Sequence, residues 1–317
     1  MTRTGQFSLA GRLRVARACR VNACIESDRA GICSGIMGQR TRPSTVGQAG
    51  ALSWATRLLR WGFHRHVRRF IRRNFHAVRA IGLEHVRSLP DGPAIGFLNH
   101  PGWWDPMTGV LMTDLLFPGR RFFAPMDAEA LSRYPLLGRL GFFPVERDSV
   151  AGTKSFLRNC RELLTSPTTL LWLTPGGRFS DVREPVEFQA GISHLIHRGF
   201  CGGAFAMAVE YPFWSERYPE LLVAFSAGVD SRALPENRDD RTRALESVLA
   251  ATQAALAERA IARDPRAFTT LATGGTGVGG CYDFCRRIVA GLRGRTFHPQ
   301  HESADLAHHR AWGGEPS

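Results

Sequence analysis

Residues 94–105 read AIGFLNHPGWWD, a short apolar run followed by a tight turn. The apolar run predicts a buried strand, and Pro101-Gly102 predicts a sharp turn directly after it. The turn carries His100 and Asp105, five positions apart. A carboxylate can fix the tautomer and orientation of an imidazole, which can then take a proton from a hydroxyl. The stretch predicts an acid–base pair at a strand end; the simpler alternative is a turn histidine before an aspartate that begins a helix.

Strand-like and helix-like segments alternate from about residue 77 onward. This alternation predicts an α/β fold, with a mixed, mostly parallel sheet flanked by helices. Strands are expected at 77–81, 94–98, 121–124, 141–145, 169–173, 204–210 and 221–227. Helices are expected at 105–116, 128–137, 149–165, 191–198 and 241–263. Asp148 or Ser149 is the expected N-cap of the third of these helices.

Composition changes along the chain predict its organisation. We expect a disordered basic extension at 1–46, an amphipathic interfacial helix at 47–76, one large domain at 77–295 and a flexible tail at 296–317. Translation from Met1 and translation from Met37 are both compatible with the sequence.

Positive charge is concentrated at the N-terminus. The 317 residues carry a formal net charge of +13, and the first 80 hold 16 Arg against two acidic residues, so the rest is nearly neutral. A basic segment binds anions, either an anionic membrane surface or nucleic acid. Since no RNA-binding motif accompanies the charge, we expect no nucleic-acid partner and keep nucleic-acid binding only as a weaker alternative.

The segment 51–76 has the pattern of an amphipathic helix. Apolar residues recur at helical spacing on one side, arginines occupy another, and Trp54 and Trp61 lie near the boundary. A cationic helix with tryptophans is typical of helices that lie in a membrane interface. The alternative is a helix that packs its apolar side on the domain, and both can hold at once.

Cysteine usage and hydropathy set the expected compartment. The seven cysteines are odd in number and form no CxxC pair, so we expect neither a disulfide framework nor a metal site. Reduced thiols suit the cytoplasm. No apolar run reaches the ~18 residues of a membrane span, and we find no signal peptide. We therefore expect a peripheral protein on the cytoplasmic face of the membrane.

Four short motifs follow one another between residues 75 and 230. The first is NHxxxxD at Asn99, His100 and Asp105, and the second is GFFPVER at 141–147. The third is TPGGRFS at 174–180, and the fourth is the apolar strand AFAMAV at 204–209. In order and spacing they resemble the motifs of the glycerolipid acyltransferase superfamily, whose type member is 1-acylglycerol-3-phosphate O-acyltransferase.

The resemblance implies an acyltransferase domain at 77–295 with a glycerol-3-phosphate acyltransferase-like fold. His100 would act as the general base on a lipid hydroxyl, and Asp105 would stabilise the imidazolium that forms. Acyl-CoA or acyl carrier protein (acyl-ACP) would be the donor co-substrate, with no other cofactor. The expected partners are that donor and the membrane lipid surface.

In this superfamily the second and third motifs are associated with binding the phosphate of the acyl acceptor. The candidate substrate-binding residues are Asn99, Gly141, Arg147, Gly176, Gly177 and Arg178. Arg147 and Arg178 also have plain alternatives, a structural salt bridge and a solvated loop. Trp103, Trp104 and Phe143 are candidates for lining the acyl or acceptor pocket, with core packing as the alternative.

The third motif departs from the family pattern. Gly176 stands where the family has Glu, and Arg178-Phe179 replaces its Thr-Arg; the fourth motif also lacks its Pro. The acceptor therefore stays open between a lysophospholipid and a lipid without phosphate, such as a glycosylated isoprenoid. A catalytically weak relative that binds lipid or protein is the alternative from another class. The segments 181–184 and 210–214 resemble a bacterial subgroup of the superfamily.

Overall fold

The computed structural model describes residues 54–146, 149–185, 187–200 and 202–275. The chain divides into two units, 1–44 and 45–317, and every described residue lies in the second. Several predictions lie outside the described residues: the extension at 1–46, the tail at 296–317, Arg147, and the start positions Met1 and Met37. The same is true of residue 47, where the predicted amphipathic helix begins, and of residue 295, where the predicted domain ends.

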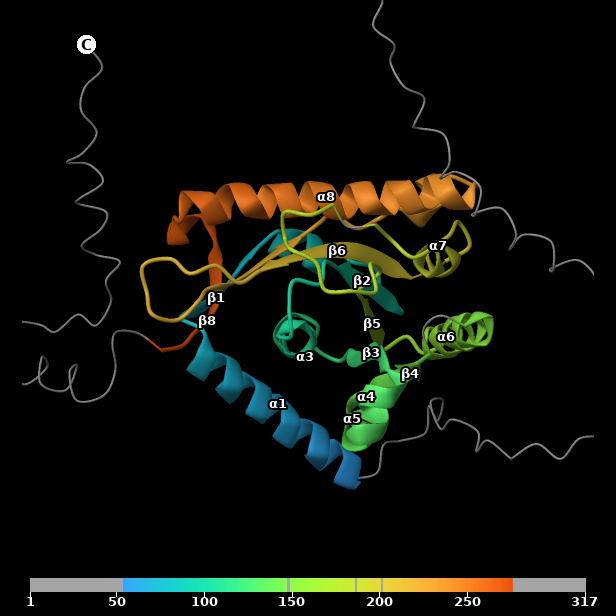
Figure 1. Cartoon of the computed structure of the whole chain (residues 1–317), viewed down its shortest axis with the longest axis horizontal. Helices are drawn as coiled ribbons and strands as arrows, with labels where there is room; N and C mark the ends of the chain where they lie inside the picture. The colour runs from blue at the N-terminus through green and yellow to red at the C-terminus, as the bar shows by residue number, and fades with distance from the viewer. Residues whose placement is uncertain (1–53, 147–148, 186, 201, 276–317) are drawn as a thin grey trace, which may run out of the picture. The chain divides into compact units, whose positions relative to one another are not determined.

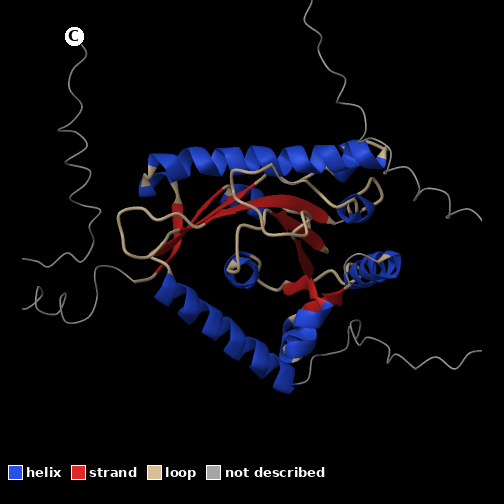
Figure 2. Cartoon of the chain, viewed as in Figure 1, coloured by secondary structure: helices blue, strands red, loops and turns tan. Residues whose placement is uncertain are grey.

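The described residues form one eight-stranded sheet with helices on both sides (Figures 1 and 2). The strands are β1 (Ala77–Ile81), β2 (Ala94–Leu98), β3 (Arg121–Asp127), β4 (Phe142–Val145), β5 (Thr169–Leu173), β6 (Gly203–Glu210), β7 (Leu221–Phe225) and β8 (Thr269–Thr273). The helices are α1 (Trp54–Asn74), α2 (Leu83–Arg87), α3 (Asp105–Leu116), α4 (Ala128–Arg133), α5 (Leu136–Leu140), α6 (Val150–Leu163), α7 (Gly191–Leu195) and α8 (Arg238–Ala262). Short 3-10 turns lie at Ser231–Ala233 and Pro265–Ala267.

The predicted fold class is confirmed. The strand order is β4-β3-β5-β2-β6-β7-β1-β8, and all neighbours are parallel except β6 with β7 and β1 with β8. Strands β2, β5 and β7 are buried along their whole length. Strands covered on both faces read as continuous apolar runs, which is why the sequence pattern located them.

Side chains that alternate along the strands form a core on each face of the sheet. One core contains residues of α1 to α5 and includes Leu98, whereas the other contains residues of α6 to α8 and includes Phe97. Figure 1 shows α1 and α8 on opposite sides of the sheet. The molecule is therefore a three-layer α/β/α structure over the described residues.

Several predicted elements differ from the structure. Strand β8 and helix α2 were not predicted: β8 is a partly exposed edge strand of sequence TTLAT, and α2 has only five residues. The helix expected at 128–137 is broken at Tyr134-Pro135 into α4 and α5, because proline disfavours helical conformation in the residue before it.

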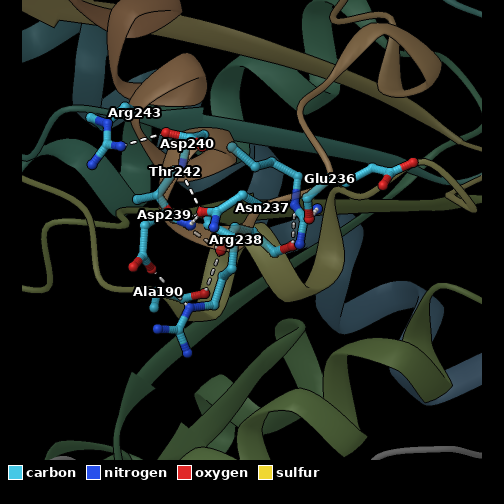
Figure 3. A network of polar contacts seen from close by, with 10 residues as sticks. Ala190, Glu236, Asn237, Arg238, Asp239, Asp240, Thr242 and Arg243 are labelled. Atoms are coloured by element: carbon cyan, nitrogen blue, oxygen red, sulfur yellow. Dashed lines mark hydrogen bonds and ion pairs between the residues drawn. The ribbon is translucent and has the colours of Figure 1, made fainter.

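Side-chain caps explain where helices α6 and α8 begin. Ser149 caps α6 by accepting from the Gly152 backbone N–H. Helix α8 begins three residues earlier than expected, because the Asn237 side chain accepts from the backbone N–H groups of Asp239 and Asp240. Figure 3 shows this N-terminal turn, together with the ion pair between Arg243 and Asp240.

Helix α1 packs its apolar side on the domain. Val67 and Ile71 are buried, and Arg68 donates to Asp114 of α3. Trp54 and Trp61 remain 78% and 63% exposed, so large apolar surface also faces outward. One side of α1 thus packs on the domain, as the alternative in the sequence analysis expected. Contact of the other side with a membrane stays a prediction. Within the described residues, no helix combines the length and apolar character needed to cross a bilayer.

A buried network of polar and charged side chains joins β1, the edge strand β8 and Glu220. Arg79 of β1 donates from Nε to Glu220 Oε2 at 3.0 Å and from a terminal nitrogen to Thr270 Oγ1 of β8 at 3.1 Å. Nε2 of His76 lies 3.8 Å from the other Glu220 oxygen. Arg79, Glu220 and His76 are all buried, so the charges of Arg79 and Glu220 are stabilised by each other rather than by water.

We expect Glu220→Ala to lower the free energy of unfolding by about 3–5 kcal/mol, because it leaves the buried Arg79 guanidinium without this carboxylate. Glu236→Ala is the matched control, since Glu236 forms an exposed pair with Arg198 and such pairs contribute at most about 1 kcal/mol. Urea denaturation of both variants measures the difference. Equal stability losses would contradict the structural role of the network.

Candidate active site

The turn between β2 and α3 brings His100 and Asp105 together. Nδ1 of His100 forms a hydrogen bond with Asp105 Oδ2, and the Gly102 backbone N–H donates to the same oxygen at 3.2 Å. The Asp105 side chain is buried, whereas that of His100 is 21% exposed. Among the described residues, no group forms a hydrogen bond with Nε2 of His100.

This geometry determines which imidazole nitrogen can act as a base. An ionised carboxylate only accepts hydrogen bonds, so a neutral His100 beside it carries its hydrogen on Nδ1. Nε2 then presents an unprotonated lone pair on a side chain that is partly exposed. The arrangement is suited to taking a proton from a hydroxyl placed at Nε2.

The other oxygen of Asp105 has a partner that the sequence analysis did not identify. The Tyr211 hydroxyl donates to Asp105 Oδ1 at 2.6 Å and lies 3.0 Å from Thr108 Oγ1. Burial and the neighbouring Asp105 carboxylate raise the pKa of Tyr211 well above its ordinary value, so the hydroxyl keeps its hydrogen. The sequence offered two signals: Tyr211 directly follows β6, and it lies in the segment 210–214 that resembles a bacterial subgroup of the superfamily.

Asn99 directly follows β2, and its side chain bonds to the neighbouring strand β6. Its side-chain amide donates to the Val209 carbonyl at 2.9 Å and accepts from the Val209 N–H at 2.8 Å. The side chain thereby continues the β2–β6 ladder one residue beyond Leu98. Asn99 is 2% exposed, so the structure places this candidate substrate-binding residue where it positions the next residue, His100.

The third motif lies directly beside His100. The Ser180 N–H donates to the His100 carbonyl at 3.0 Å, and the ring centroid of Phe179 lies 4.3 Å from that of the imidazole. Gly177 has a φ of +68°, a conformation that favours glycine. Arg178 is exposed and its guanidinium lies 3.4 Å from a carboxylate oxygen of Glu184. Gly176 lies in the same turn and is half-buried.

The remaining candidates have different surroundings. Gly141 has a φ of +114°, and a Cβ there would lie 2.2 Å from the Phe122 carbonyl oxygen, so the backbone requires glycine. Phe143 is buried in the core beside α6. Trp104 contacts the Phe75 ring, with centroids 4.9 Å apart, whereas Trp103 is 64% exposed at the start of α3. Of the three pocket candidates, Trp103 is the most exposed.

The described part of the chain has no group of three or more His, Cys, Asp or Glu side chains arranged to hold a metal ion.

Comparisons with known proteins bear on the class of this site. A family model described as Acyltransferase matches residues 77–209. No curated protein matches the chain. Among solved structures, the crystal structure of the 1-acyl-sn-glycerophosphate (LPA) acyltransferase PlsC from Thermotoga maritima is similar, with 12% sequence identity and a TM-score of 0.42. The match covers 64% of this chain and 79% of that chain.

We expect Asn99→Ala to lower the free energy of unfolding by at least about 1–3 kcal/mol, because it leaves the buried N–H and C=O of Val209 without their partner. Chemical denaturation measures the loss. Asn74→Ala is the control, because among the described residues the Asn74 side chain bonds only to a carbonyl one turn earlier in its own helix. If the two variants lost the same stability, the bridge from Asn99 to β6 would not be the stabilising contact.

Proposed function

We propose that this chain is an acyltransferase of the glycerolipid acyltransferase superfamily, and that it moves a fatty acyl group from acyl-CoA or acyl-ACP to a lipid hydroxyl; the family model that matches residues 77–209 supports the acyltransferase class. The observation that carries this proposal is the hydrogen bond from His100 Nδ1 to Asp105, in a histidine whose side chain is 21% exposed and whose Nε2 is hydrogen-bonded to none of the described residues. A base of this kind is what a hydroxyl needs in order to attack a thioester.

The proposed reaction proceeds without an acyl-enzyme. The acceptor hydroxyl lies at Nε2 of His100 and gives up its proton as its oxygen forms a bond to the thioester carbonyl carbon. Asp105 stabilises the imidazolium. The tetrahedral intermediate then collapses, the carbon–sulfur bond breaks, and the leaving thiolate takes the proton from His100. The products are the acylated lipid and the free thiol of the carrier.

Two acceptor classes remain in the proposal. A lysophospholipid follows from the family, with Arg178 as a contact for its phosphate. A lipid without phosphate, such as a glycosylated isoprenoid, is favoured by Phe179, an exposed ring in contact with His100. An aromatic face suits a sugar ring or an apolar chain better than an anion. The Arg178 guanidinium is also shared with Glu184, which reduces its attraction for a phosphate.

We expect His100→Ala to abolish acyl transfer, and Asp105→Asn to slow it by about 10²–10⁴-fold, because general base catalysis contributes that much. The measurement is thiol release from palmitoyl-CoA, and separately from acyl-ACP, in the presence of liposomes and a panel of lysophospholipids and glycolipids. The acceptor that gives release identifies the substrate class. His85→Ala, a change in the partly exposed histidine of α2, should retain wild-type activity.

The opposite result has a definite meaning. If no donor and acceptor pair gives more thiol release with the wild type than with His100→Ala, the chain is not an acyltransferase for these lipids. A relative of the same fold that binds lipid or protein would then be the better description.

We also propose that α1 docks the protein peripherally on the cytoplasmic face of a membrane. Its exposed side carries Trp54, Leu58 and Trp61 in its N-terminal half, and the exposed Arg65 and Arg69 follow them. Tryptophan at the level of the lipid headgroups and arginine near anionic lipid are both favourable. Such docking would bring a lipid acceptor to the enzyme while the donor arrives from solution.

We expect the double variant Trp54→Ala/Trp61→Ala of the full chain to bind phosphatidylglycerol vesicles at least about tenfold more weakly, because burying each large apolar side chain is worth about 1.5–3 kcal/mol. Vesicle co-sedimentation measures the change. Ile261→Ala is the matched control, since Ile261 is 80% exposed on α8, on the other side of the sheet. Equal binding by all three proteins would exclude α1 as the docking element.

A further inference from the structure

We infer that Tyr211 is a positioning residue for the acyl transfer proposed above, and that it fixes the Asp105 carboxylate in the orientation that holds His100. This inference rests on the proposed function for its role in catalysis. The contact itself is a property of the fold, and the first observation is that both carboxylate oxygens of Asp105 are bonded. Oδ2 accepts from His100 and Gly102, and Oδ1 accepts from Tyr211 at 2.6 Å.

The bonds to the two oxygens come from different parts of the chain. His100 and Gly102 belong to the same turn as Asp105, so their bonds cannot fix that turn relative to the rest of the molecule. Tyr211 follows β6, more than 100 residues away. Its hydroxyl therefore joins the first turn of α3 to the sheet, and rotation of the carboxylate would break this bond as well as the bond to His100.

The direction of the hydrogen bonds is determined by chemistry. An ionised carboxylate has no hydrogen to give, so the single hydrogen of Tyr211 goes to Asp105. The Thr108 hydroxyl lies 3.0 Å from Tyr211 Oη and also 3.1 Å from the Trp104 carbonyl. The single Thr108 hydrogen can go to the Trp104 carbonyl or to the Tyr211 oxygen, both of which can accept it. In either case the Tyr211 hydrogen is donated to Asp105, which also accepts from Nδ1–H of His100.

The packing of the tyrosine ring makes the role of its hydroxyl separable from that of its ring. The ring lies 5.6 Å from that of Phe75 and packs against the core on the α1 side of the sheet. Phenylalanine would keep these contacts and lose only the hydroxyl. Thr108 is fully buried, so water cannot easily replace the missing group. The expected effect of Tyr211→Phe is a looser Asp105, rather than an unfolded domain.

We expect Tyr211→Phe to lower kcat about 10–100-fold, as is typical when a group that supports a catalytic side chain is removed. KM for donor and acceptor should stay within about twofold, because Tyr211 contacts Asp105 and not the open side of His100. Tyr134→Phe is the matched control, since Tyr134 is 63% exposed at the end of α4 and should behave as wild type.

A second measurement needs no substrate. The proton in the hydrogen bond between His100 and Asp105 should give a far-downfield NMR resonance, assigned by its loss in His100→Ala. Tyr211→Phe should shift or broaden this resonance, whereas Tyr134→Phe should leave it unchanged. If Tyr211→Phe does not fold, Thr108→Val tests the same chain of bonds and should shift the resonance by a smaller amount.

The outcomes separate this inference from the proposed function. An unshifted resonance in Tyr211→Phe overturns the inference, whether or not activity is lost. A shifted resonance with wild-type kcat also overturns it, because the contact would then be structural only. If the wild type itself shows no acyl transfer, the proposed function fails, and the resonance alone decides whether Tyr211 orients Asp105.

Discussion

The bridge between the Asn99 side chain and the Val209 backbone is the contact on which the site depends. It bonds β6 to the residue directly after the last residue of β2, where the backbone pairing of the two strands has ended. His100 follows Asn99 by one residue, and Tyr211 follows Val209 by two. The bridge therefore sets the separation of two side chains that both bond to Asp105. A small change in the sheet at this point would alter both bonds.

The positions of the motifs follow from the strand order. Strands β5, β2 and β6 are parallel neighbours, so their carboxyl ends meet at one edge of the sheet. The turn with His100 follows β2, the 174–180 loop follows β5, and Tyr211 follows β6. Ligand sites of open α/β sheets lie at this edge. Segments that are distant in the sequence therefore surround one imidazole.

The sequence predicted those parts of the fold and the site that depend on local pattern. Strand β2, helix α3 and the pair His100–Asp105 lie within one stretch, where the apolar run and the turn residues leave few alternatives. Strand β8 was missed because it is an edge strand with little apolar side chain to reveal it. Tyr211 was missed because its role depends on β6 lying beside β2, and no local pattern contains the strand order.

Side-chain direction explains what the motifs alone could not determine. Phe142 and Phe143 are neighbours in the second motif, but adjacent strand residues point to opposite faces, and the two rings enter different cores. A motif shows that such residues occur together, whereas only the structure shows which of them lie near the chemistry. The same holds for Asn99, whose amide is engaged with the sheet.

The contact of Phe179 with His100 also bears on the competition between two nucleophiles. In the reaction proposed above, a base that deprotonates a lipid hydroxyl could also deprotonate water, and attack by water would hydrolyse the thioester donor. Phe179 covers part of the imidazole with an apolar surface, which reduces the directions from which water can approach the ring. An amphiphilic acceptor can displace water from that ring surface. For an acyltransferase, one aromatic side chain beside the base thus favours transfer over loss of the acyl group.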